Sequence, residues 1–144
     1  MRRLACTLLT APGASYAGKS VYVITFYKAQ EWALRAALKN AGHPERIAGE
    51  SGEGGSLRVT TVDQVQGSEA DVVILSCTRA NERRSIGFVS NPNRLNVAIS
   101  RARERLIVIG HVGTMTASDK NWQRLHAACT VVTSARHLPP INTH

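Results

Sequence analysis

The sequence is poor in cysteine, in aromatic residues and in acidic residues, and it has no long hydrophobic run. Its three cysteines, Cys6, Cys77 and Cys129, are far apart and form no Cys-x-x-Cys or Cys/His cluster with metal-ligand spacing. We therefore expect no metal site, and we expect reduced thiols in a cytoplasmic or nuclear chain, with Cys77 in the core. No apolar run approaches the roughly 20 residues of a membrane span, and the first ten residues are too polar for a signal peptide, so we expect no membrane partner.

The shortage of acidic residues leaves the chain strongly basic. Ten Asp and Glu residues face 18 Lys and Arg residues, which gives a formal net charge of +8. Such a balance favours a polyanionic partner, with nucleic acid first, although a basic surface kept for solubility is an equal alternative on charge alone. With 43% hydrophobic and 19% charged residues in 144, the composition is that of one globular domain.

Strand-like and helix-like segments alternate along the chain. We expect strands at 21–27, 57–62, 71–76 and 105–110, a short edge strand at 131–132, and helices at 2–11, 30–41, 91–102 and 119–129. This order predicts an α/β fold with a mainly parallel sheet and helices on both faces, whose functional groups gather at the carboxyl ends of the strands. Trp32 and Trp122 are expected as core anchors. The glycine-rich residues 42–56 read as a loop without an assigned role, and residues 134–144 as a loose tail.

Residues 13–20 match the phosphate-loop pattern G-x-x-x-x-G-K-[ST] at every position. That pattern binds phosphate when a strand precedes it and a helix follows, because the helix N-terminus supplies converging amides. Here a predicted helix precedes it and a predicted strand follows at once. We therefore expect Lys19 not to bind phosphate, which makes an independent phosphate-loop kinase or NTPase the weakest of the candidate functions.

Two blocks carry the chemistry, VTTVDQVQGSEADVVILSCTRAN from Val59 and GFVSNPNRLNVAISRARERLIVIG from Gly87. They resemble the fifth and sixth motifs of superfamily 1 helicases, in the subgroup of the RNA-surveillance helicase and its DNA-replication nuclease-helicase relatives. VYVITFYKAQ, which begins at Val21, resembles the fourth motif of the same group. The resemblance covers about residues 20–130 in unbroken order. It implies that residues 1–133 are the second RecA-like domain of such a helicase, with the P-loop NTPase type of sandwich.

The resemblance implies an ATP site shared with a first RecA-like domain. Arg101 matches the arginine finger that neutralises charge on the γ-phosphate, and Glu69 matches the carboxylate that takes the ribose hydroxyls. The other residues matched to the nucleotide cleft are Gln66, Gly67, Arg94, Tyr27 and Gln30. Arg94 and Arg101 are seven residues apart, which predicts one shared helix face. The cofactor implied is ATP with Mg²⁺, the metal being held by the first domain.

The resemblance also implies a single-stranded RNA or DNA partner. Thr25, Thr60 and Thr61 fall at predicted strand ends and match contacts to the nucleic-acid backbone, although β-forming threonines are an equal alternative. Arg79, Arg83 and Arg84 could extend that track. The sequence has no candidate for the first domain's phosphate loop or Mg²⁺-binding acidic pair, so we expect the chain alone not to turn over ATP. A non-catalytic module that binds nucleic acid or protein is the second candidate function.

Overall fold

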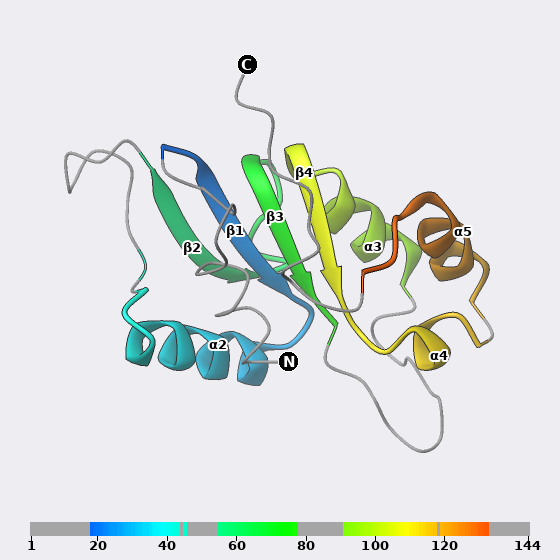
Figure 1. Cartoon of the computed structure of the whole chain (residues 1–144), viewed down its shortest axis with the longest axis horizontal. Coiled ribbons are helices and arrows are strands. Elements are labelled where there is room, and N and C mark those ends of the chain that lie inside the picture. Colours follow the sequence, from blue (N-terminus) through cyan, green and yellow to red (C-terminus); the bar gives the residue numbers. More distant parts are fainter. Residues whose placement is uncertain (1–17, 44, 46–54, 78–90, 118, 133–144) are drawn as a thin grey trace.

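The computed structural model describes residues 18–43, 45, 55–77, 91–117 and 119–132. These ranges contain the strands β1 (Ser20–Thr25), β2 (Ser56–Thr61), β3 (Ala70–Ser76) and β4 (Ala102–Ile109), and the helices α2 (Lys28–Asn40), α3 (Pro92–Ile99), α4 (Val112–Met115) and α5 (Lys120–Ala128) (Figure 1). The predicted helix at 2–11, residues 13–17 of the phosphate-loop pattern, the three arginines at 79, 83 and 84, and the tail at 134–144 lie outside the described residues.

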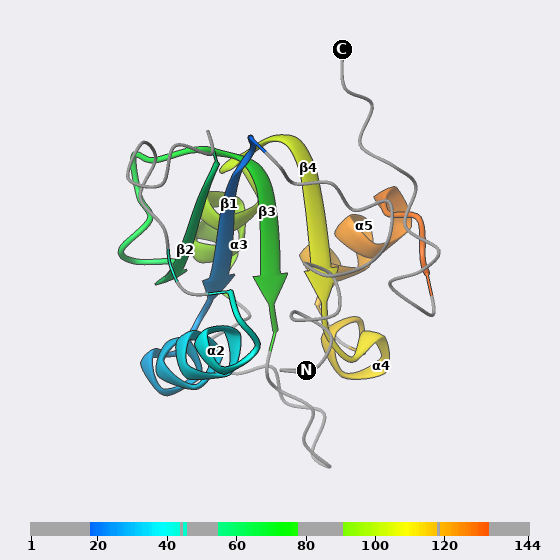
Figure 2. The same cartoon turned by 60° about the vertical axis from the view of Figure 1, so that its left-hand side comes forward.

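The four strands form one sheet in the order β2-β1-β3-β4, and every neighbouring pair is parallel. Figure 2 shows the four arrowheads pointing the same way, with α2 and α3 on opposite sides of the sheet. The predicted α/β fold with a parallel sheet and helices on both faces is therefore confirmed. Because the strands are parallel, all of them begin at one end of the sheet and finish at the other.

Alternating side chains divide the core into two layers. On one face, Val21 and Val23 of β1 pack with neighbouring strands against Leu34 and Leu38 of α2. On the other face, the apolar side chains of β1 and β3 pack against α3, α4, α5 and the connection from β2 to β3; the members from the last four are Leu95, Ala98, Met115, Trp122, Val62 and Val65. Strand β3 is buried on both faces, as its unbroken apolar run predicts, and Cys77 at its end is buried, as expected.

The prediction that Trp32 of α2 anchors the core was wrong. Trp32, expected as a core anchor, is 62% exposed, whereas Glu31 is buried beside Leu34 and Leu38. Glu31 can take that position because Lys28 and Arg35 lie one turn to either side, with N–O distances of 2.8 and 2.7 Å. A carboxylate paired with two cations thus replaces the apolar residue that a hydrophobic stripe calls for. Trp122 is buried in α5, as predicted.

In the described sheet β2 is an edge strand, and side chains bind the outward backbone groups of Val59 at its middle. The amide of Val59 donates to Oε1 of Glu45 at 2.8 Å, and the carbonyl of Val59 accepts from Nη2 of Arg35 at 3.1 Å. Arg35 also contacts Oε2 of Glu45 at 2.7 Å, so the two side chains form one unit. Burial alone would lower the pKa of Arg35, but the hydrogen bonds to Glu45 and Glu31 raise it. Satisfied backbone groups make this edge a poor template for strand addition.

Helix α3 is shorter than predicted. Asn91 caps it, since its side chain accepts from the amides of Asn93 and Arg94, and Pro92 takes the first position, both as expected. The helix ends at Ile99, however, and Ala102 already belongs to β4. Near the chain's end, α4 was not predicted, and residues 131–132 form no strand with the part of the sheet described. The four residues of α4 are too few to show a periodic apolar pattern in the sequence.

Candidate functional site

The residues singled out in the sequence lie at two opposite ends of the sheet. The amino-terminal rim, where the strands begin, comprises Lys19, Ser20, Glu69, Asp71, Arg101, Arg103 and Glu104; the carboxyl-terminal rim, where they finish, comprises Thr25, Tyr27, Gln30, Thr60 and Thr61. The expectation that functional groups gather at the carboxyl ends is therefore wrong for Glu69 and Arg101. Glu69 directly precedes β3 and Arg101 directly precedes β4, so the parallel strands place both at the start of the sheet.

Arg101 is held by neutral oxygen atoms. Its Nη1 donates to the carbonyl of Ser68 at 3.4 Å, and its Nη2 donates to the hydroxyl of Ser100 at 3.1 Å. Its own carbonyl accepts from the amide of Ala70 at 3.0 Å, which ties the turn before β4 to the start of β3. The Nε atom is buried and has no hydrogen-bond partner among the described residues. Arg101 thus carries a half-buried charge that no carboxylate in the described chain neutralises.

The other cations of the same region each face a carboxylate. Lys19 lies 2.8 Å from Glu104, and Arg103 bridges Glu69 at 3.4 Å and Asp71 at 3.3 Å. Their charges are therefore balanced within the amino-terminal rim. Arg101 differs from both, although it is only two residues from Arg103 in the sequence.

Asp71 is the best-anchored carboxylate of the amino-terminal rim. Its Oδ2 accepts from the amide of Ser20 at 2.9 Å and from the Ser20 hydroxyl at 3.1 Å, while the same hydroxyl accepts from the Asp71 amide at 2.9 Å. The backbone hydrogen bond from Ser20 is the largest cause of a lowered pKa at Asp71. The Ser20 hydroxyl and Arg103 add to the lowering, against the opposing effect of burial. Asp71 therefore locks the starts of β1 and β3 together as a charged group.

The described end of the phosphate-loop pattern has no phosphate-binding geometry. Lys19 is paired with Glu104 of β4, and Ser20 is the first residue of β1 and is bonded to Asp71. A strand follows the lysine, so no helix N-terminus is there to aim converging amides at an anion. The interpretation of this pattern as a chance match is supported.

Arg94 does not lie beside Arg101, contrary to the prediction of one shared helix face. Arg94 is in the first turn of α3 and binds both oxygens of Asp63, at 3.1 and 3.3 Å. Arg101 follows the last residue of the helix by two positions. Eight helical residues extend about 12 Å, so the two guanidinium groups belong to opposite ends of the element.

The connection from β2 to β3 runs along α3 and carries the other nucleotide candidates. Asp63 meets Arg94 at one end of this connection, and Ser68 meets Arg101 at the other. Gly67 has φ +83°, a left-handed conformation that glycine adopts without strain, and Gln66 beside it is exposed. The described parts of the two motif blocks therefore meet at both ends of this connection, with Gly67 turning the backbone just before Glu69.

The three threonines meet at the carboxyl-terminal rim but are closed to solvent. Thr25 is opposite Thr61 in the β1–β2 register, and Thr25, Thr60 and Thr61 are 0%, 1% and 8% exposed. The Thr60 hydroxyl donates to the carbonyl of Thr61 at 3.3 Å, and the Thr61 hydroxyl donates to Gln64 at 3.3 Å. The Thr25 hydroxyl has no partner in the described chain. A buried hydroxyl without a partner destabilises the free domain.

Tyr27 and Gln30 flank the start of α2, next to the end of β1. Tyr27 caps the helix through its carbonyl, which accepts from the amide of Glu31 at 3.0 Å. The side-chain nitrogen of Gln30 is buried and lacks a partner among the described residues. Together with Thr25, this places two unsatisfied polar side chains at the end of β1.

Sequence reasoning missed the residues that organise these rims. Asp71 and Arg103 were not singled out, because neither belongs to a motif position with an assigned role and the two residues, 32 apart in the sequence, meet only when β3 and β4 pair. The pair Glu31 and Arg35 did carry a signal, since their i, i+4 spacing favours an ion pair on one helix face. Glu45 joins them from a glycine-rich stretch that gave no local pattern.

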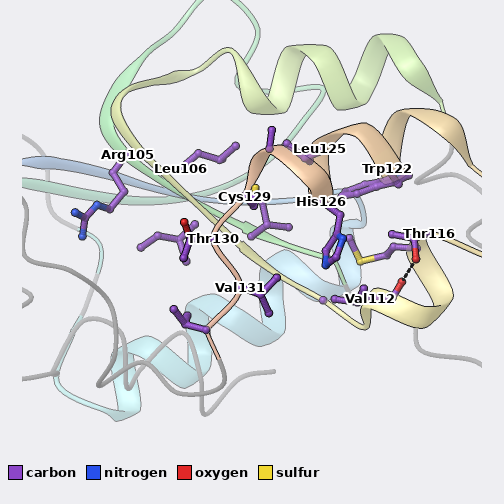
Figure 3. A pocket seen from close by; sticks show the side chains of 16 residues that line it. Arg105, Leu106, Val112, Thr116, Trp122, Leu125, His126, Cys129, Thr130 and Val131 are labelled. Carbon is purple, nitrogen blue, oxygen red and sulfur yellow. Dashed lines mark hydrogen bonds between the residues drawn. The ribbon is translucent and has the colours of Figure 1, made fainter.

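A cavity of about 560 Å³ lies away from both rims, between β4, α4, α5 and residues 129–132 (Figure 3). Its labelled walls include Leu106, Val112, Trp122, Leu125 and Val131, so it is largely apolar. None of the residues predicted to bind nucleotide or nucleic acid lines it.

The described part of the chain offers neither a metal-binding cluster nor a helix that could span a membrane. No group of three or more His, Cys, Asp or Glu side chains there is placed to hold a metal ion. No helix there is both long enough and apolar enough to cross a membrane.

Comparison with known proteins gives a consistent family. A family model described as an AAA domain matches residues 3–113. The chain is 36% identical over 108 residues to the probable helicase senataxin of Homo sapiens, which is 74% of this chain and 4% of that protein. It is 37% identical over 104 residues to the helicase required for RNAi-mediated heterochromatin assembly 1 of Schizosaccharomyces pombe, 72% of this chain and 10% of that protein. Over 69 residues it is 42% identical to the regulator of nonsense transcripts 1 homolog of Drosophila melanogaster, 48% of this chain and 6% of that protein. The chain thus spans a tenth or less of the length of these relatives.

Proposed function

The chain belongs to the AAA domain family, and from this premise we propose that it is the second RecA-like domain of an ATP-dependent RNA or DNA helicase. The parallel sheet agrees with that role, and the similar proteins are helicases by name. In the proposed arrangement a first RecA-like domain completes the ATP site, in the same polypeptide or in another, and single-stranded nucleic acid crosses both domains. A cytoplasmic or nuclear location remains a prediction.

The observation that carries this proposal is that no carboxylate of the described chain pairs with Arg101. Its neighbours Lys19 and Arg103 are neutralised by carboxylates, whereas Arg101 is held, among the described residues, by the carbonyl of Ser68 and the hydroxyl of Ser100 alone. These contacts hold the guanidinium in place and leave its charge unbalanced. An incoming phosphate would supply the missing counter-charge. An arginine finger placed in this way increases the rate of hydrolysis by roughly 10³–10⁵.

The nucleotide's other contacts are assigned from the same rim. Glu69, whose side chain is about half exposed, accepts the ribose hydroxyls, and the left-handed turn at Gly67 with Gln66 beside it brings the backbone to that point. Bound ATP with Mg²⁺ supplies the phosphoryl group that is transferred to water. The residues present fit this group, because a carboxylate suits hydroxyls and an unbalanced cation suits phosphate. We place the Mg²⁺ ligands on the first domain.

We assign roles away from Arg101 and Glu69 to three further residues, Arg94, Tyr27 and Gln30. Arg94 is engaged with Asp63, so we propose that it braces the connection that carries Gly67 and Glu69. Tyr27 and Gln30 lie at the carboxyl-terminal rim, where the buried and unsatisfied amide of Gln30 fits a surface that the other domain or the nucleotide completes.

The carboxyl-terminal rim provides the proposed nucleic-acid track. Thr25, Thr60 and Thr61 offer hydroxyls and backbone groups of the kind that contact phosphates without reading sequence. Thr61 is the most accessible of the three, and the Thr25 hydroxyl is the one that still lacks a partner. The basic net charge of +8 favours any such polyanion.

ATP hydrolysis with and without single-stranded RNA and DNA tests the proposal. The 144-residue chain alone should show no turnover, and a two-domain protein in which a first RecA-like domain precedes this chain should be active. In that protein, Arg101→Ala should lower the rate of hydrolysis by roughly 10³-fold or more and leave ATP affinity largely intact. The matched control is Arg124→Ala, which removes an exposed arginine of α5 and should leave the rate unchanged. Hydrolysis retained by the Arg101 variant would sink the finger assignment and favour a non-catalytic binding module.

A further inference from the structure

Glu69, the carboxylate assigned to the ribose, is paired with Arg103, its one hydrogen-bond partner among the described residues. Nε of Arg103 lies 3.4 Å from Oε2 of Glu69. The second carboxylate oxygen, Oε1, accepts no hydrogen bond from the described part of the chain. The conformation of Glu69 therefore depends on where Arg103 is held.

Arg103 is held by the most firmly anchored group of the amino-terminal rim. Its Nη1 lies 3.3 Å from Oδ1 of Asp71, whose other oxygen accepts from the amide and the hydroxyl of Ser20. The contacts thus form a continuous line from β1 through β3 to β4 and on to the turn before β3. The planar guanidinium is suited to this place because it can address two carboxylates at once in a fixed geometry.

From this line of contacts we propose that Arg103 is a positioning residue for ribose recognition. It fixes one oxygen of Glu69 and leaves the other to accept the ribose hydroxyls, so it acts on the nucleotide only through Glu69. The proposal rests on the proposed function, because it takes the ribose role of Glu69 from there. It explains why two arginines two residues apart differ in their contacts. Arg101 is available to bind the nucleotide's phosphate, whereas Arg103 pairs with two carboxylates of the protein.

A purely structural ion pair is the alternative explanation, and stability measurements would not separate the two. The Arg103 and Glu69 side chains are 55% and 54% exposed, so their pairing contributes little to folding under either explanation. Selectivity for the ribose does separate them, because a surface ion pair has no reason to distinguish nucleotides that differ only in the sugar hydroxyls. The readout is therefore the ratio of the affinities for ATP and for 2′,3′-dideoxy-ATP.

The experiment titrates the ¹⁵N-labelled 144-residue chain with each nucleotide and follows the amide chemical shifts to obtain both dissociation constants. The wild-type chain should prefer ATP by about tenfold, the usual effect of a hydrogen bond to a charged group. Glu69→Gln and Arg103→Ala should both bring this ratio close to one. Arg103→Lys should recover only part of it, since an ammonium cannot bridge both carboxylates in the same way. Arg124→Ala should keep the wild-type ratio.

The outcomes distinguish this inference from the function on which it rests. A ratio that Glu69→Gln abolishes and Arg103→Ala preserves would overturn the role of Arg103 and leave the ribose role of Glu69 standing. Wild-type protein that binds both nucleotides equally would overturn the role of Glu69 and that of Arg103 with it. If the isolated chain binds neither nucleotide, the same ratio decides in the two-domain protein, in which the first domain completes the site. In the unliganded Arg103→Ala chain, amide shifts that change only near residue 103 and its partners, and stay unchanged in β1, β2 and the far halves of β3 and β4, would show that the loss of selectivity is not a loss of fold.

Discussion

The two ends of the sheet carry polar groups of different kinds. At the amino-terminal rim, charged side chains at or just before the starts of three strands pair with one another, and Arg101 is the rim's cation that no carboxylate of the described chain neutralises. At the carboxyl-terminal rim the polar groups are neutral, buried and incompletely bonded, as Thr25 and Gln30 show. In the described chain, the charges of the amino-terminal rim are paired except for that of Arg101, whereas the carboxyl-terminal rim has polar groups without hydrogen-bond partners. An anion fits the former, and a ligand rich in hydrogen-bonding groups fits the latter.

The largest effect on stability is expected from the anchor of the amino-terminal rim. Asp71→Ala removes the acceptor of two hydrogen bonds from Ser20 and of one from Arg103, and should lower the free energy of unfolding by about 2–3 kcal/mol. The matched control is Asp63→Ala near the other rim, which also pairs with an arginine but is 62% exposed. It should cost less than about 1 kcal/mol in denaturant titrations. Equal losses of unfolding free energy in the two variants would contradict the stronger anchoring of Asp71.

Lowering the pH tests the contribution of Asp71 to stability in a second way. Because the pKa of Asp71 is lowered in the folded chain, its stabilising effect is fully present above its ordinary pKa of about 3.9 and is lost as the pH falls through the lower folded value. The difference in unfolding free energy between the wild-type chain and Asp71→Asn should therefore be constant near pH 7 and shrink below about pH 4. A difference that grew in acid would contradict the assigned sign.

The next largest effect concerns the turn that leads to Glu69. Gly67 has φ +83°, and a Cβ there would meet nothing within 4 Å, so any cost of substitution comes from the backbone alone. Gly67→Ala should lower the free energy of unfolding by about 1–2 kcal/mol. Gly67→Asn should cost less, because asparagine tolerates this conformation better. Equal stability of the alanine variant and the wild type in thermal unfolding would show that the turn relaxes.

A smaller effect of opposite sign is expected at the carboxyl-terminal rim. Thr25→Val replaces a buried hydroxyl without a partner by a methyl group and should raise the free energy of unfolding by about 1 kcal/mol. Thr114→Val is the matched control and should destabilise the chain, because the Thr114 hydroxyl is 2.8 Å from Nδ1 of His111.

The Thr25 variant also decides between the two interpretations of the threonines. If Thr25 contacts a phosphate, Thr25→Val should weaken the binding of single-stranded RNA, measured by fluorescence anisotropy, while it stabilises the fold. Unchanged RNA affinity would leave Thr25 as a strand-forming residue only. A stability that fell instead would mean that the hydroxyl is satisfied.

The smallest effect is expected at Lys19. Its ion pair with Glu104 is partly exposed, so Lys19→Ala should change the free energy of unfolding by less than about 1 kcal/mol. Nucleotide affinity, measured in the same titration as for Arg103, should not change. Loss of nucleotide binding would restore the phosphate-loop interpretation and overturn the distinction between Lys19 and Arg101.

Local sequence patterns predicted most of the described strands and helices and the covering of both sheet faces, but not α4 or the early end of α3. The apolar run of β3, the Asn91-Pro92 start of α3 and the alternation of strands and helices all rest on local physics, namely burial on two faces, capping and periodicity. Only the tertiary structure decided which end of the sheet each functional residue occupies and whether its charge is balanced. Glu31 is buried, Arg101 lies beyond the end of α3, and Arg103 pairs with Asp71, because partners 4 to 33 residues away supply the hydrogen bonds. Periodicity reports which face a residue occupies, whereas neutralising a charge requires contacts that only the packed strands bring together.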